Sequence, residues 1–196
     1  MSFKPRIVIV GDSFAKGISG ELQRNLKYDL EVIGYVRPGS GMEEITTVAK
    51  QDITALTKKD MIRVWGGAND IARNEANKAL THITNYVESR KHTNVLIVSV
   101  PTRFDLISTS CANKEVIAYN RKVSKWMKKY EHVKLIDCDL LRRCYTRYGM
   151  HMNLTGKELL SQRIMEHIKE LFSKKETSTI IKLQWKQEMD KRNTLT

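Results

Sequence analysis

The sequence has few cysteines, no long apolar run and no apolar N-terminal stretch, and each of these features excludes a class of protein. It has three cysteines in 196 residues, an odd number without any Cys-x-x-Cys pair, so neither a disulfide framework nor a zinc site is indicated. We expect no metal and no other cofactor. There is no apolar run of about 18 residues, which excludes a membrane-spanning helix. The N-terminal residues lack the apolar stretch of a secretory signal, so we expect an intracellular protein, cytoplasmic or nuclear.

The sequence also lacks the glycine motifs that bind phosphate, and it has fewer acidic than basic residues. Neither Gly-x-x-x-x-Gly-Lys nor Gly-x-Gly-x-x-Gly follows a predicted strand, which argues against a nucleotide-binding protein. No RRM, KH or zinc-knuckle signature is present either. The 22 Asp and Glu are outnumbered by 34 Lys and Arg, which gives a formal charge of +12. Such an excess favours phosphate backbones, anionic lipid surfaces or acidic substrates as partners.

Short segments rich in Val and Ile alternate with stretches of helical periodicity. This alternation is typical of a parallel sheet with right-handed crossovers, and five strands predict a three-layer α/β/α flavodoxin-like, doubly wound domain of strand order 2-1-3-4-5. We expect this domain to span residues 1–172 and residues 173–196 to form a tail, either disordered or a docking helix. The predicted strands are Arg6–Val10, Leu30–Val36, Met61–Trp65, Asn94–Val100 and Val133–Cys138. The predicted helices are Ala15–Lys27, Met42–Leu56, Asn74–Arg90, Lys114–Lys129 and Gly156–Phe172.

Two loops are expected at the point where this strand order reverses, beyond the carboxyl ends of the strands, which is where such sheets bind ligands. The first contains Gly11–Ser13 (Gly-Asp-Ser), in which a serine placed just before a helix is suited to act as a nucleophile. The other contains Gly66–Asp70 (Gly-Gly-Ala-Asn-Asp), and the Asn69 side chain is a donor of the kind that oxyanion holes use. Gly-Asp-Ser alone is equally typical of a helix N-cap.

Two further loops are expected along the same edge of the sheet. Arg37–Gly41 follows the second strand, and its turn offers free amides that can donate to an oxyanion. Tyr148–Asn153 follows the fifth strand just ahead of the last helix, so His151 is placed to take the serine proton and return it to the leaving group. A lone histidine is more often incidental, and the four loops carry weight only together.

In order and spacing these blocks resemble the SGNH (GDSL-type) hydrolase superfamily, and the resemblance spans Arg6 to Phe172. It implies a serine esterase or deacylase that hydrolyses small, acetyl-like acyl esters through an acyl-serine. Ser13 would be the nucleophile and His151 the base. The oxyanion hole would consist of the Ser13 and Gly39 amides and Asn69, with Gly41 as the alternative to Gly39. Pro101–Asp105 and Gly149–Asn153 are similar to stretches of SGNH-type domains in animal mobile-element open reading frames.

The acid of the triad departs from the pattern of that family. Most members carry an aspartate three residues before the histidine, where this chain has Tyr148. A neutral phenol can position the imidazole but supplies no charge to the imidazolium. Three outcomes stay open: a Ser13–His151 dyad, a substitute carboxylate from Asp139 or Asp105, or an inactive site.

A binding protein is the alternative function. Between Arg121 and Arg147 the sequence is strongly basic and includes Trp126, Tyr130 and Tyr145, and aromatic rings among cations can stack on single-stranded bases. The ligand would be RNA, another polyanion or an anionic lipid, although a run of charge is more often a solvated helix face. Arg142, Arg143 and Arg147 also precede His151 closely enough to favour an anionic ester. The candidate anion-binding residues are Arg121, Lys122, Lys125, Lys128, Lys129, Arg142, Arg143 and Arg147.

Overall fold

The computed structural model describes residues 4–26 and 30–171. The chain forms two compact units, Met1–Ser161 and Gln162–Thr196, and the second is described only as far as residue 171, where it is helical. The predicted boundary at residue 172 and the predicted tail 173–196 lie outside the described residues.

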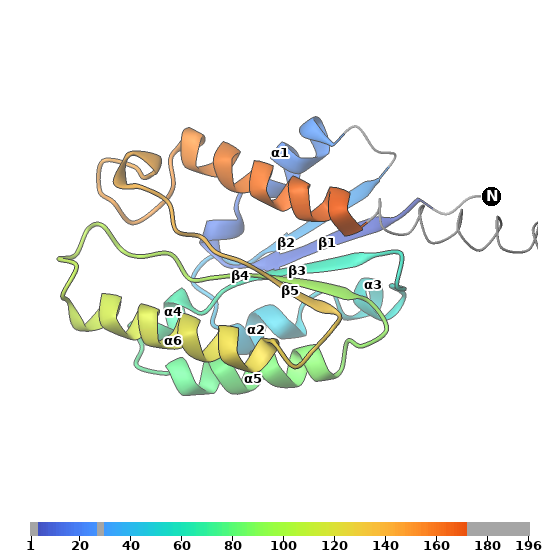
Figure 1. Ribbon diagram of the computed structural model, residues 1–196, viewed down its shortest axis with the longest axis horizontal. Coiled ribbons are helices and arrows are strands. Elements are labelled where there is room, and N and C mark those ends of the chain that lie inside the picture. The colour runs from blue at the N-terminus through green and yellow to red at the C-terminus, as the bar shows by residue number, and fades with distance from the viewer. Residues whose placement is uncertain (1–3, 27–29, 172–196) are drawn as a thin grey trace, which may run out of the picture. The chain divides into compact units, whose positions relative to one another are not determined.

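A five-stranded parallel sheet of order β2-β1-β3-β4-β5 forms the centre of the first unit (Figure 1). This confirms the predicted order and fold class. All four strand pairs are parallel, because a crossover returns the chain to the same end of the sheet before each new strand. The strands are β1 (Arg6–Gly11), β2 (Glu31–Val36), β3 (Met61–Trp65), β4 (Asn94–Val98) and β5 (Val133–Ile136).

The helices are more numerous than the periodicity predicts, and those in the first half of the chain are shorter. Gly17 has a φ of 84° and separates a 3-10 turn from the first α-helix, and Ala49, with a φ of 55°, divides the predicted helix Met42–Leu56 into two. The elements are η1 (Ser13–Ala15), α1 (Ile18–Asn25), α2 (Met42–Thr47), α3 (Lys50–Thr54), α4 (Ala68–Ala72), α5 (Ala76–Glu88), α6 (Cys111–Met127) and η2 (Arg142–Cys144), followed by a helix over residues 154–171.

The central strands β1, β3 and β4 are buried on both faces, as their apolar runs predict, whereas the edge strands β2 and β5 are partly exposed. Alternate residues of β1, β3 and β4, such as Val8, Ile62 and Ile97, face the larger core with α2, α5 and α6. The intervening residues point to the opposite face, on the side of α1 (Figure 1). Every helix within the described ranges is too short or too polar to cross a bilayer.

Candidate active site

The turn after β1 presents Ser13 at the predicted reversal point of the sheet. The Asp12 N–H donates to the Trp65 carbonyl at the end of β3 over 3.1 Å, and the Asp12 carboxylate caps η1 by accepting from the Phe14 N–H at 2.9 Å. At Gly11 a side chain would lie 2.6 Å from the Trp65 oxygen, so the close approach of these strand ends requires glycine. Ser13 is therefore fixed between two central strands.

His151 reaches Ser13 from the histidine loop, which we define as residues 145–152. The Ser13 Oγ and His151 Nε2 atoms are 3.3 Å apart. An antiparallel bridge between Tyr145 and Met152 closes the loop, and the Thr146 N–H donates to the His151 carbonyl at 2.8 Å. The imidazole also packs against Phe14, with ring centroids 5.4 Å apart. The sequence separation of 138 residues is thus reduced to hydrogen-bonding distance.

The second imidazole nitrogen has no carboxylate hydrogen bond among the described residues. Tyr148 is 83% exposed, so its phenol does not pack against the ring. Asp105 makes a bidentate contact with Arg103, at 3.1 and 2.5 Å, and this contact lowers the pKa of the carboxyl; His151 acts in the same direction, which shows that the two groups lie in electrostatic range. Asp139 is exposed and acts electrostatically on Tyr145.

The glycine loop, residues 37–41, is held by three side chains from α4 and its C-terminal end. The Asn69 Nδ2 donates to the Ser40 carbonyl at 2.9 Å, and the Arg73 guanidinium donates to the Gly39 carbonyl at 2.8 Å. The Asp70 carboxylate packs so closely on Gly41 that an added Cβ would lie 2.8 Å from its oxygen. Gly39, with a φ of 79°, stays exposed.

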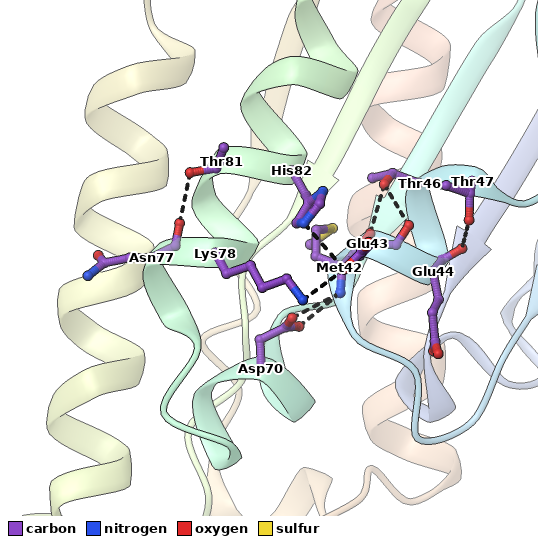
Figure 2. Close-up of polar contacts among 10 residues, drawn as sticks. All are labelled: Met42, Glu43, Glu44, Thr46, Thr47, Asp70, Asn77, Lys78, Thr81 and His82. Carbon is purple, nitrogen blue, oxygen red and sulfur yellow. Dashed lines mark hydrogen bonds and ion pairs between the residues drawn. The ribbon is translucent and has the colours of Figure 1, made fainter.

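Asp70 connects this loop to a polar network on α2 and α5. Its carboxylate accepts from the Met42 N–H, at 2.9 and 3.2 Å, at the start of α2 (Figure 2). Burial raises the pKa of Asp70, and the Met42 amide opposes that rise. The next residue of α2, Glu43, pairs with Lys78 at 2.8 Å and lies 3.6 Å from His82, both on α5. The start of α2 is thereby fixed against two helices.

Asp12, the residue before Ser13, carries a buried carboxyl group. Its side chain is 1% exposed, and its Oδ2 has no hydrogen-bond partner among the described residues. Burial raises the pKa of Asp12 to about 7, against the Phe14 hydrogen bond and with a smaller contribution from Asp70. The motif Gly-Asp-Ser predicts that Asp12 or Ser13 caps a helix, but it does not predict that the Asp12 carboxyl is buried.

The predicted basic surface is divided between two places. Tyr130, three residues after the end of α6, and the buried residues of α6 belong to the larger core. Arg142, Arg143 and Arg147 lie instead in the segment that leads to His151, on the other side of the sheet (Figure 1). Arg142 is turned inward to the loop carbonyls of Thr146 and Arg147. Of the three predicted stacking rings, Tyr130 and Tyr145 are buried and Trp126 is 42% exposed.

Metal-binding potential is low in the part of the chain that the structure describes. No group of three or more His, Cys, Asp or Glu side chains comes together there in a way that could hold an ion.

Several solved structures have a fold similar to that of this chain. A GDSL-like lipase from Bacteroides thetaiotaomicron gives a TM-score of 0.70 at 17% identity, over 84% of this chain and 88% of that one. An acetylxylan esterase from Geobacillus stearothermophilus gives a TM-score of 0.68 at 14% sequence identity, over 86% of this chain and 96% of that one. An aryl esterase from M. smegmatis gives a TM-score of 0.67 at 16% sequence identity, over 85% of this chain and 99% of that one. The fold is that of GDSL-type hydrolases. No protein-family model and no curated protein sequence matches the chain.

The GDSL-type fold confirms the expected architecture, while the roles of individual residues rest on the geometry above. Sequence reasoning missed Asp70 and Arg73 as the residues that hold the glycine loop. The signal for Asp70 was its place directly after Asn69, since a carboxylate near a helix N-terminus is favourable. Arg73 carried no signal, because a single exposed arginine is ordinary.

Proposed function

We propose that this protein is a serine esterase that hydrolyses small acyl esters, acetyl esters among them, through Ser13 and His151. The contact of 3.3 Å between Ser13 Oγ and His151 Nε2, at the carboxyl edge of a GDSL-type sheet, carries the proposal. An acetylxylan esterase and an aryl esterase share the fold, which supports acyl esters as the substrate class. The likeness to mobile-element SGNH domains stays a prediction.

In the first half-reaction the Ser13 oxygen attacks the ester carbonyl carbon while His151 Nε2 takes the serine proton. The carbonyl oxygen becomes an oxyanion, which the Ser13 and Gly39 amides and the Asn69 side chain stabilise. Gly39 is favoured over Gly41 because Gly39 is exposed, whereas Gly41 is buried against Asp70. The bond to the leaving oxygen then breaks, that oxygen takes the proton from His151, and the acyl group stays on Ser13.

In the second half-reaction water attacks the acyl carbon, gives a proton to His151 and releases the acid. Ser13 recovers its proton from the imidazole. Since Tyr148 is exposed and Asp105 is paired with Arg103, the histidine works as part of a dyad. Loss of the acid from a triad commonly lowers the rate by about 10⁴, so we expect slow turnover.

The test is hydrolysis of p-nitrophenyl acetate by the wild type, Ser13→Ala and His151→Ala. Each substitution is expected to lower kcat/KM by about 10² or more, because each removes a partner of the same proton transfer. Ser108→Ala and His92→Ala replace exposed residues of the same types outside the site and serve as matched controls. Equal hydrolysis by all five folded proteins would overturn the proposal.

A further inference from the structure

The outward face of α6 carries positive charge that the ester site does not use. Residues 114–129 contain six Lys or Arg and a single acid, Glu115, and all six basic residues are exposed. Arg121, Lys125 and Lys128 lie at i, i+4 and i+7, which places them in one stripe along the helix. Among the described residues these three form no ion pair. Their charges therefore face solvent.

Trp126 lies beside this stripe and is flanked by two further cations. Lys122 precedes it by four residues and donates to Asn77 on α5 at 3.1 Å, and Lys129 follows it by three and lies 3.8 Å from Glu88. The core of the domain takes Val123 and Met127 from this part of α6. Trp126 instead keeps 42% of its surface exposed. Part of the indole is therefore accessible from solvent.

We propose that this face of α6 binds single-stranded nucleic acid. Arg121, Lys125 and Lys128 would contact successive phosphates, and the Trp126 ring would stack on a base, the combination that sequence-tolerant strand-binding proteins use. A membrane fits less well, because interfacial helices insert a broad apolar face. The apolar face of α6 is buried in the core, and Ile117 and Trp126 are the large apolar side chains that it exposes.

The proposed surface is separate from the ester site. α6 starts at Cys111, after the loop that leaves the carboxyl end of β4, and runs back toward the start of β5 (Figure 1). The basic residues occupy its second half, so they lie away from the edge that carries Ser13. Substitutions on this face are expected to leave ester hydrolysis unchanged, and the two activities can fail independently.

The test measures binding of the full chain to a labelled uridine strand of about 15 nucleotides as salt rises from about 50 to 200 mM. The pair Arg121→Gln and Lys125→Gln is expected to reduce the slope of log K against log salt by about 1.4, or 0.7 for each lost phosphate contact. The pair Lys50→Gln and Lys59→Gln removes the same charge from exposed positions on the α3 side and is the matched control. Equal losses in both pairs would overturn the proposal.

Trp126 separates stacking from charge. Trp126→Ala is expected to lower affinity by about tenfold with an unchanged salt slope, and Trp126→Phe to keep most of the affinity, because any aromatic face can stack on a base. Affinity that is indifferent to Trp126→Ala would contradict stacking. Binding to phosphatidylserine vesicles without binding to the uridine strand would overturn the proposal in favour of a membrane.

Discussion

The glycine loop and the histidine loop both reach the turn after β1, the first through the Arg37 N–H at the Gly11 carbonyl and the second through His151 at Ser13, but the chain holds them differently. On the glycine side Asn69, Asp70 and Arg73 each bond to or pack on a different loop residue. On the histidine side the backbone of His151 is hydrogen-bonded, while its second ring nitrogen has no carboxylate partner among the described residues. The comparison shows that side chains hold the glycine loop, whereas backbone hydrogen bonds hold the histidine loop. If the proposed function is right, we expect the oxyanion hole to be preorganised and His151 to limit the rate.

The largest effect is expected at Asp12, which interacts electrostatically with Asp70 on the glycine side. Because burial raises the pKa of Asp12 to about 7, the folded state keeps a proton that the unfolded chain has already released, so stability falls as pH rises from about 4 to about 7. Asp12→Asn removes that loss. At pH 8 the variant should be more stable than the wild type by up to about 4 kcal/mol, and near pH 4 the two should be similar.

Urea unfolding of both proteins at the two pH values measures this difference. A gap of the same size at both would mean that Asp12 titrates at its ordinary value, and that this carboxyl is better solvated than its 1% exposure implies.

The next largest effect is expected from the loss of the Asn69 side chain, which holds the glycine loop. Asn69→Ala should lower kcat for p-nitrophenyl acetate by about 10², or roughly 3 kcal/mol, with little change in KM, because the amide acts on the oxyanion. Asn85→Ala, at an exposed position of α5 where alanine is compatible with the helical backbone, is the control. Steady-state kinetics that show a change in KM alone would assign Asn69 to substrate binding.

Tyr148→Asp tests whether the histidine loop lacks a carboxylate that could stabilise the imidazolium of His151. A carboxylate three residues before His151 can stabilise the imidazolium, so kcat should rise by about tenfold, or 1.4 kcal/mol. Tyr148→Asn has the same size without the charge and should stay at the wild-type rate. If Tyr148→Asp gave no gain, a substitute such as Asp105 or Asp139 would already supply the charge, and the proposed contrast between the loops would be wrong.

The smallest effect is expected at Arg73. Its guanidinium bonds to the Gly39 carbonyl, so Arg73→Gln should lower kcat by about threefold, in keeping with one hydrogen bond worth about 1 kcal/mol or less. Arg37→Gln is the control for charge, because it removes an arginine of the same loop whose backbone N–H donates to the Gly11 carbonyl at 2.8 Å. Equal losses in the two variants would show that positive charge, and not the position of Gly39, matters.

The sequence predicted the sheet order and the loops that carry Ser13 and His151, because apolar periodicity and the strand-end rule act over whole elements. It did not predict where side chains point. Arg63, within a strand predicted as buried, is fully buried with none of its guanidinium nitrogens hydrogen-bonded among the described residues, and burial lowers its pKa to about 9. The bond from Arg73 to Gly39 likewise depends on rotamers that spacing does not specify.

Closeness along the chain was also a poor guide to closeness in space. Arg121 to Lys129 and Arg142 to Arg147 form a single basic stretch in the sequence, yet β5 carries the chain across the sheet between them. Tyr130 and Tyr145 were predicted as stacking rings and are buried, since an aromatic residue among charges can equally be the apolar position of an amphipathic segment.

The central claim, that Ser13 forms an acyl intermediate, is tested most directly by the mass of the intact protein when turnover of p-nitrophenyl acetate is stopped by acid. Because the dyad should deacylate slowly, a fraction of the wild-type protein is expected to carry one acetyl group, which peptide mapping places on Ser13 and which is absent from Ser13→Ala. An acetyl group on another residue, or hydrolysis that continues in Ser13→Ala at the wild-type rate, would contradict the account.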